Sequence, residues 1–428
     1  MMRNSSVALQ MVLAVAVCFG FPAGAPLKAA PPKGITDAQR TAYVAKAQVW
    51  DREQYEAARS LTADAIKNGP PDEDAFKFNQ AVTCRFVEPT LKNVIGGQTA
   101  KFYCGRGTDT APCPECNVTQ KELKVKYGSD PGANPEIYSE VIGTRLMWVL
   151  GFKADRDYAV RVTCVSCPAD PWSVYQTFRG RVGGLDEHKP EDVAKAAAIA
   201  SGLGGTRATR SFQSAVIEVK LPGDKLKVGD PKCASPDNEA TDPRCGGFSW
   251  KEISIINPAS GGATREQLEA WELLAAFMTH GDNKPGNQRL TCPEGSLGAD
   301  GICSMTYVMI QDIGAGFGSA GFLGLGYRKA DIGSWSGQPL WADRNACRAK
   351  LTSVHELKNP TVSEAGRAFL AKLMDPTVLT DDKVAAIFEA SRVTEKGDKF
   401  QGHPATVADW VGAFDKKRAD LAQPCGGH

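Results

Sequence analysis

The sequence predicts an α+β fold in which a part rich in β-strands precedes a mainly helical part. In the first part, three segments carry the alternating apolar pattern of strands: AVTCRFVEP from Ala81, TAKFYCGR from Thr99 and KELKVKYG from Lys121. In the second part, apolar residues recur at helical spacing in the segments 264–278, 363–374, 381–391 and 405–421. With 428 residues, 42% of them hydrophobic and 23% charged, the chain is long and apolar enough for one large core or two lobes.

Residues 1–30 have the pattern of a secretory signal peptide. A positive charge at Arg3 precedes an apolar run from Val7 to Phe21, and small residues and prolines follow. We expect this segment to be removed from a secreted or periplasmic protein with no stable membrane anchor, because the run is short for a membrane span. A buried N-terminal helix is the alternative.

The overall charge gives no reason to expect nucleic acid or an anionic membrane as a partner. The chain has 50 Lys and Arg against 49 Asp and Glu. Residues 1–30 contain Arg3 and Lys28 but no acidic residue, so their removal leaves 48 against 49. A nearly neutral chain lacks the basic surface on which nucleic-acid binding depends.

Twelve cysteines remain after Cys18 of the signal peptide is set aside, and in an oxidising compartment they predict disulfides. Four pairs are expected, two across short loops and two over longer distances: Cys292 with Cys303, Cys233 with Cys245, Cys84 with Cys104, and Cys347 with Cys425. The other four cysteines form two CxxC motifs, Cys113/Cys116 and Cys164/Cys167. A four-cysteine Zn²⁺ site at these motifs is the alternative to disulfides.

The chain divides into four regions. After the signal peptide, residues 31–72 are expected to form a helical extension, which ends at the breaker sequence GPPDED from Gly69. Residues 73–222 contain the three strand segments and two more, at 158–164 and 215–221, with a helical segment at 190–203 between them. Residues 223–428 form the helical part.

Two lysines and two glutamates stand out in the first part. Lys124 and Lys126 alternate with apolar residues on the third strand segment, and Glu136 and Glu140 lie four residues apart on the helix expected over 134–150. A solvated lysine face is the ordinary explanation of such alternation. Between the first two strands, Gly96-Gly97 predicts a turn at which backbone N–H groups are accessible to an anion, and a plain hairpin turn is the alternative.

The candidate chemistry lies in two short motifs of the second part, HGDNKPGNQ from His280 and QDIG from Gln311. A buried helix over 264–278, with Thr264 and Gln267 as an N-terminal capping pair, leads into the first motif. The residue types suit phosphoryl transfer: Asp282 to accept a hydroxyl proton, Lys284 to neutralise phosphate charge, and Asn287 and Asp312 as oxygen ligands of Mg²⁺. The alternative is a polar surface turn whose side chains only cap and shape the bend.

The first motif resembles known catalytic loops. HGDNKPGN is similar to the protein kinase loop H-R-D-L-K-P-x-N and to the H-G-D-L-H-P-G-N loop of aminoglycoside and choline phosphotransferases, which belong to the same superfamily. Asp282, Lys284 and Asn287 match the protein kinase version, as does Pro285. Gly281 and Gly286 match the small-molecule version. Gly281 replaces the arginine that many protein kinases use to bind a phosphorylated activation loop.

The resemblance implies a two-lobed protein kinase-like fold, with an antiparallel β-sheet N-lobe over 73–222 and a mainly helical C-lobe over 223–428. It also implies ATP and Mg²⁺ as cofactors, a strand lysine that holds phosphates, and a helix glutamate that fixes the lysine. By order along the chain these are Lys126 and Glu140, with Lys124 and Glu136 as substitutes. Gly96-Gly97 would lie over the phosphates, and Pro222-Gly223 would follow the hinge between the lobes.

Three functions remain open from the sequence. The first is a secreted kinase that transfers the γ-phosphoryl group of ATP to Ser or Thr of a protein, which Lys284 favours. The second is transfer to a small-molecule or sugar hydroxyl, favoured by Gly281, Gly286 and the lack of an A-P-E anchor after the run AGFGSAGFLGLG. The third is a pseudokinase or a disulfide-rich binding protein.

His280 is expected to be structural, and the other histidines, His188, His355, His403 and His428, lack the spacing of metal ligands.

Overall fold

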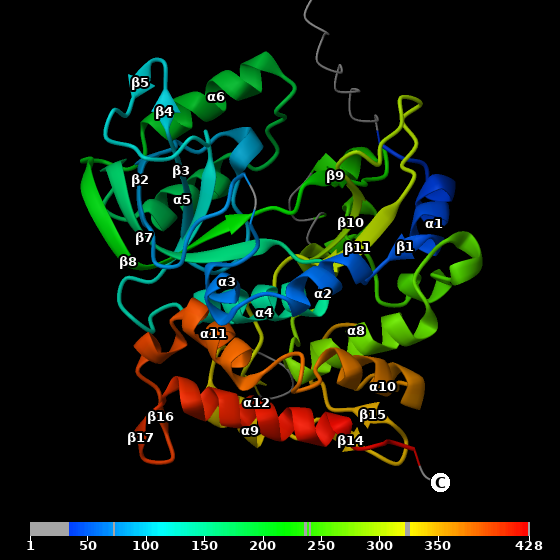
Figure 1. The fold of residues 1–428 in the computed structure, drawn as a ribbon. Helices are drawn as coiled ribbons and strands as arrows, with labels where there is room; N and C mark the ends of the chain where they lie inside the picture. Colours follow the sequence, from blue (N-terminus) through cyan, green and yellow to red (C-terminus); the bar gives the residue numbers. More distant parts are fainter. Residues whose placement is uncertain (1–33, 72, 235–237, 239–240, 322–325, 427–428) are drawn as a thin grey trace, which may run out of the picture.

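The structure, a computed structural model, describes residues 34–71, 73–234, 238, 241–321 and 326–426. The expected signal peptide at 1–30 lies outside these residues. The described chain is a mixed α/β protein that contains a β-barrel, a separate four-stranded sheet beside it, and a layer of helices beneath both (Figure 1). The prediction of a mixed fold with strands first and helices later is confirmed at this level.

The strands of the first part close into a five-stranded barrel in the order β2-β3-β6-β8-β7. Their bounds are Ala81–Phe86 (β2), Lys101–Gly105 (β3), Leu123–Tyr127 (β6), Arg156–Cys167 (β7) and Ala208–Val219 (β8). The expectation of a purely antiparallel sheet was wrong, because β2 pairs in parallel with β7 while the other neighbours are antiparallel. An odd number of strands that alternate in direction around a closed ring leaves one parallel pair. The inside of the barrel is apolar, with Val82, Phe102 and Val125 fully buried.

Helix α4 (Glu136–Leu150) connects β6 to β7 and contacts the barrel through β7. Nearly all of its residues are buried, because the barrel, helix α2 (Arg52–Arg59) and helix α11 (Asp381–Ser391) surround it. Helix α5 (Pro171–Arg181) contacts strand β3 of the barrel, and α6 (Pro190–Ser201) packs against α5. The sequence patterns did not indicate α5, whose first turn is capped by the side chain of Asp170. Short strands β4 (Gly107–Thr108) and β5 (Ala111–Pro112) form a hairpin between β3 and β6.

A second sheet has the order β1-β11-β10-β9, with bounds Ala47–Gln48 (β1), Thr306–Ile310 (β11), Gln288–Pro293 (β10) and Gly223–Lys225 (β9). Its centre is the antiparallel hairpin β10–β11, in which Gln288 pairs with Ile310. The sequence patterns did not indicate β10. The hairpin explains why the two candidate motifs are far apart in the sequence. The chain between them runs away from the first motif along β10 and returns to the second motif along β11.

Within the described residues 34–71, the expected extension contains three separate helices, with bounds Asp37–Ala45 (α1), Arg52–Arg59 (α2) and Ala63–Asn68 (α3). Strand β1 between α1 and α2 pairs with β11. Ion pairs also attach the extension to the second part, Arg40 with Glu252 at 2.7 Å and Lys67 with Glu389 at 2.8 Å.

The helices of the second part form the layer at the bottom of Figure 1 and pack around an aromatic core. Trp335, Trp410 and Phe388 are in ring contact at its centre. The bounds are Arg265–Phe277 (α8), Ile332–Gly337 (α9), Glu364–Leu373 (α10), Asp381–Ser391 (α11) and Val407–Ala422 (α12). Three hairpins complete the described elements, β12 (Ser319–Ala320) with β13 (Tyr327–Arg328), β14 (Trp341–Asp343) with β15 (Arg348–Ala349), and β16 (Lys399–Phe400) with β17 (His403–Pro404). Among the described residues, no helix is both long and apolar enough to span a bilayer.

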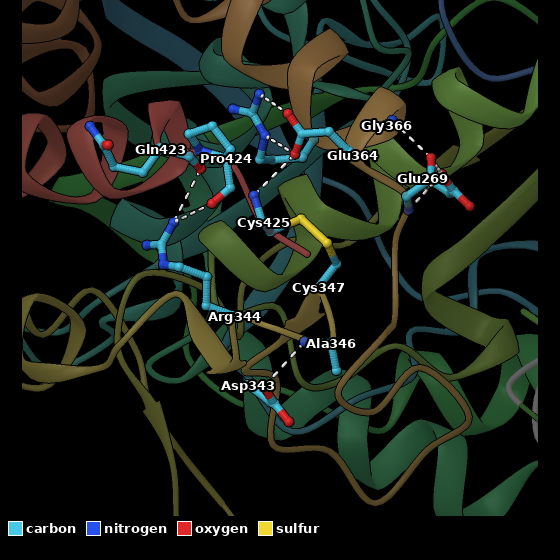
Figure 2. The surroundings of a disulfide bond; sticks show 12 residues. Glu269, Asp343, Arg344, Ala346, Cys347, Glu364, Gly366, Gln423, Pro424 and Cys425 are labelled. Carbon is cyan, nitrogen blue, oxygen red and sulfur yellow. Dashed lines mark hydrogen bonds and ion pairs between the residues drawn. A yellow bond between two sulfur atoms is a disulfide. The ribbon is translucent and has the colours of Figure 1, made fainter. Parts of the chain in front are cut away.

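Six disulfides are present, and the four predicted pairs are among them. Each CxxC motif forms its own disulfide, Cys113 with Cys116 and Cys164 with Cys167, so these sulfurs are not thiolates for Zn²⁺. Figure 2 shows the Cys347–Cys425 bond, which ties the C-terminal segment to the β14–β15 hairpin. Arg344 donates to the carbonyl groups of Gln423 and Pro424 in the same region.

Candidate functional site

The loop that contains Asp282 begins where α8 ends. The Thr264 and Gln267 capping pair starts α8 as predicted, and the backbone N–H of His280 donates to the carbonyl of Ala275 at the helix end. His280 is completely buried. A helix with a buried apolar face thus holds the start of the loop in a fixed position.

Asp282 is the centre of a polar cluster on this loop. Its Oδ2 lies 2.9 Å from Lys284 Nζ, and its backbone carbonyl accepts a 2.6 Å hydrogen bond from Asn287 Nδ2. Burial by itself would raise the pKa of Asp282, but the charge of Lys284 and hydrogen bonds from Lys284 and Asn287 lower it below its ordinary value. Asp282 is therefore an ionised acceptor at neutral pH.

His355 also contacts Asp282, with Nε2 3.0 Å from Oδ1. The sequence analysis placed this histidine among the scattered ones and missed it. The segment around it is fastened to the loop by Ser353, whose Oγ donates to the carbonyl of Gly281 at 2.6 Å, and by Leu357, whose N–H donates to Asn283 Oδ1 at 3.1 Å. No spacing rule connects positions so far apart in sequence, so only the fold could reveal the contact.

Asn287 and Asp312 are neighbours at the open end of the β10–β11 hairpin. The backbone carbonyl of Asn287 accepts from the N–H of Gln311 at 2.9 Å and from that of Asp312 at 3.3 Å. The Asn287 side chain uses its amide nitrogen toward Asp282, which leaves its oxygen as the atom type that binds Mg²⁺. The hairpin therefore joins the second motif to the first.

Lys126 lies on the outer face of the barrel, 2% exposed, and forms an ion pair with Glu140 of α4. Its Nζ is also 3.7 Å from Glu136 Oε1 and 4.0 Å from Asp312 Oδ2. Burial disfavours a charged lysine, but the carboxylates of Asp312 and Glu140 raise the pKa of Lys126 well above its ordinary value. Lys126 is therefore a protonated ammonium that links the barrel, α4 and Asp312.

The substitute pair that the sequence left open, Lys124 with Glu136, does not form. Lys124 instead pairs with Glu218 of β8 at 2.7 Å. Glu136 accepts from Thr99 Oγ1 and pairs with Lys329, which lies beyond the glycine-rich run. Part of that run, residues 322–325, falls outside the described residues.

Two glycines let the Asp312 segment approach α4 closely. A Cβ on Gly314 would lie 2.2 Å from Glu136 Cγ, and a Cβ on Gly143 would lie 2.4 Å from Ile313 Cγ2.

A third glycine explains why the first motif has no arginine after its histidine. A Cβ on Gly281 would lie 2.6 Å from the carbonyl oxygen of Thr352, so this backbone approach leaves no room for a side chain.

Three carboxylates lie close enough to share a cation. Glu136, Glu140 and Asp312 each offer an oxygen, and these atoms lie within 4.8 Å of one another. Lys126 already neutralises part of this group. The charges of Lys126, Lys101 and Lys124 hold the pKa of Asp312 below its ordinary value, against the opposing effect of its removal from bulk water. Asp312 is therefore a carboxylate that a hard cation could bind together with the Asn287 oxygen.

Gly96 and Gly97 lie in the connection from β2 to β3, close to the lysines of the barrel. Gly97 has φ +84°, and a Cβ at this position would lie 2.9 Å from Nζ of Lys101. Lys101, the first residue of β3, is a buried lysine that the sequence analysis did not single out. The turn therefore folds over the lysine-bearing face of the barrel.

A cavity of about 770 Å³ adjoins this region. It is lined by Thr99, Tyr127, Trp172, Tyr327 and Lys329, among others. A smaller cavity of about 220 Å³ lies at the passage from the barrel to the second sheet, where Pro222 lines it together with Trp148 and Lys153. Pro222-Gly223 thus lies where the chain leaves β8 and enters β9.

The site as a whole consists of two linked groups. Asp282, Lys284, Asn287 and His355 form the first, and Lys126, Glu136, Glu140 and Asp312 form the second, with the β10–β11 hairpin between them. Comparison of the chain with protein-family models, with curated proteins and with solved structures gave no match.

Proposed function

We propose that the protein is a kinase-like phosphotransferase that moves the γ-phosphoryl group of ATP to a hydroxyl group. The observation that carries the proposal is the position of Lys126. This lysine is on the third strand of the barrel in chain order, is paired with a glutamate of the helix that follows, and is 4.0 Å from Asp312. In protein kinases a lysine on the third strand, a glutamate on the next helix and a magnesium-binding aspartate form the corresponding set.

The proposed roles follow from the chemistry of each group. Lys126 would hold the α- and β-phosphates while Glu140 fixes its side chain. Asp282 would accept the hydroxyl proton and orient the attacking oxygen. Its lowered pKa makes it a weak base, but phosphoryl transfer depends mainly on positioning and on stabilisation of charge. Lys284, next to Asp282, would neutralise charge on the transferred group.

Mg²⁺ fits the oxygen atoms of Asn287 and Asp312. We favour this position over the Glu136–Glu140 side because the Lys126 ammonium already compensates those glutamates. Two hard oxygen ligands from the protein, with phosphates and water completing the shell, are the usual arrangement for Mg²⁺. Held by Asn287 and Asp312, the ion would supply positive charge that offsets the charge of the phosphates.

The acceptor we favour is a Ser or Thr hydroxyl of a protein, on the basis of the Lys284 position in the motif. We also infer that the enzyme works outside the cytoplasm, because six disulfides are rare in reducing compartments. Such an enzyme needs a source of nucleotide where it acts.

The experiment is a thermal-shift titration of the disulfide-intact protein with Mg²⁺ and ATP, followed by incubation with γ-labelled ATP. We expect a rise in melting temperature that Asp312→Ala abolishes. Asp109→Ala, at an exposed turn of the barrel, should keep the rise. No rise in the wild-type protein would favour a binding protein without turnover. A rise with label transfer only to sugars or other small hydroxyl compounds would favour a small-molecule kinase.

A further inference from the structure

Lys101 is a buried lysine without a carboxylate partner in the described part of the chain. It is 5% exposed, and its Nζ lies 5.9 Å from the ring centroid of Trp172. The nearby Lys126 and Lys329, by contrast, both pair with carboxylates. A buried charge with no partner is costly, so a side chain of this kind favours the binding of an anion.

The position of Lys101 on the barrel is next to Lys126. The two residues are direct partners in the β3–β6 register. Side chains of directly opposite residues on antiparallel strands lie on the same face of the sheet. Lys101 therefore belongs to the face that carries Lys126, Glu140 and Asp312. Its pKa is lowered to about 8, first by burial and then by the charges of Lys126 and Lys124, while the carboxylates of Glu136 and Asp312 act in the opposite direction.

The Gly96-Gly97 turn covers the Lys101 ammonium without enclosing it. The missing Cβ of Gly97 leaves space that Lys101 Nζ approaches, and a side chain there would be only 2.9 Å away. A Cβ on Gly96 would have no atom within 4 Å, so that side is open. Backbone N–H groups of a glycine turn can approach phosphate oxygens closely.

The geometry points to a phosphate subsite formed by Lys101 and the Gly96-Gly97 backbone, which binds the phosphate chain of a nucleoside di- or triphosphate beside Lys126. This inference rests on the proposed function, since it assigns a second cation to the same nucleotide. The resemblance to kinases implies one strand lysine and the Gly96-Gly97 turn at the phosphates, and the new element is Lys101 as a second strand lysine at the same place. The anion would be the direct ion-pair partner that Lys101 lacks among the described residues.

The test compares the binding of ATP and of adenosine, each with Mg²⁺, to the full-length protein by calorimetry. Lys101→Met should weaken ATP binding by at least about tenfold, because it removes a hydrogen bond between charged groups. Adenosine has no phosphate, so its affinity should not change. Lys101→Arg, which keeps the charge, should retain most of the ATP affinity. The matched control is Lys92→Met, an exposed lysine in the same connection between β2 and β3.

The possible outcomes separate this inference from the proposed function. Equal ATP affinity in wild type and Lys101→Met overturns the subsite alone. An equal loss of ATP and adenosine affinity also overturns it, since that pattern indicates a structural role. Absence of ATP binding in the wild-type protein overturns both proposals. If Lys101→Met does not fold, Gly97→Ala provides the second test, because its methyl group would displace the Lys101 ammonium and should weaken ATP but not adenosine.

Discussion

His355 Nε2 lies 3.0 Å from Oδ1 of Asp282, although the two residues belong to separate segments of the second part. The contact depends on a short segment, Ser353 to Leu357, whose two end residues are hydrogen-bonded to the loop that begins at His280. Asp282 is thus held from two sides, by Lys284 of its own loop and by His355.

We expect His355→Ala to reduce phosphoryl transfer by about tenfold or more, because it removes a hydrogen bond to a charged group, which contributes about 1.5–3 kcal/mol. The affinity for ATP should not change, since His355 contacts the proposed base and not the proposed nucleotide ligands. Initial rates of transfer at saturating ATP, together with ATP affinity, check this. Asp282→Asn is the reference, with an expected loss of about 10²–10⁴-fold. A wild-type rate in His355→Ala would remove the histidine from the mechanism.

Gly314→Ala should weaken the binding of Mg²⁺ and ATP, whereas Gly412→Ala should not. Its new Cβ would lie 2.2 Å from Glu136 Cγ, so α4 or the Asp312 segment must move. Overpacking of this kind costs about 1–3 kcal/mol, and we expect at least about tenfold weaker binding of Mg²⁺ and ATP. Gly412→Ala on the exposed side of α12, where a Cβ meets no atom within 4 Å, should stabilise the fold by up to about 1 kcal/mol. Thermal unfolding with and without Mg²⁺ and ATP measures the stability of both variants and the effect of the nucleotide on each. If the nucleotide raises the melting temperature of Gly314→Ala as much as that of the wild type, the close approach of Gly314 to α4 does not matter for binding.

His280 should make the protein less stable in acid. Burial lowers its pKa from 6.5 to about 4, and both ring nitrogens lack a hydrogen-bond partner in the described chain. Because the folded pKa is depressed, the neutral histidine contributes its full stability above pH 6.5, and this contribution is lost as the pH falls through about 4. The shift corresponds to about 3 kcal/mol.

His280→Phe lacks this titration. Its free energy of unfolding should therefore fall by about 2 kcal/mol less than that of the wild type between about pH 7.5 and about pH 4.5. Denaturant unfolding at the two pH values gives the comparison, and His188→Gln, an exposed site, is the control. If His280→Phe and the wild type lose the same free energy of unfolding between the two pH values, His280 does not cause the loss of stability in acid.

The Cys347–Cys425 disulfide should contribute more stability than either CxxC disulfide. It closes a span of 78 residues, and the Cys113–Cys116 bond closes a span of 3. In the chain-entropy model the larger loop corresponds to about 4 kcal/mol and the smaller to about 2 kcal/mol. Denaturant unfolding of the two double Cys→Ser variants under oxidising conditions tests the order. Equal losses would indicate that contacts such as those of Arg344 with the C-terminal segment, shown in Figure 2, hold that end without the bond.

The sequence by itself determined the features that depend on local order. Apolar periodicity predicted the helices at 264–278, 363–374, 381–391 and 405–421, and the Thr264 cap, because helices bury one face and need an N-terminal acceptor. Cysteine spacing predicted the Cys233–Cys245 and Cys292–Cys303 disulfides, since short loops rich in turn residues bring their ends together.

Only the tertiary structure decided which distant groups meet. Five features depend on packing between segments far apart in the chain. They are the closure of the barrel with one parallel pair, the β10 strand, the choice of Glu140 as the ion-pair partner of Lys126, the burial of Lys101, and the contact of His355 with Asp282. Sequence patterns record which face of an element is apolar. They do not record which element covers that face, and the charged residues of this site meet because the barrel, α4 and the β10–β11 hairpin cover one another.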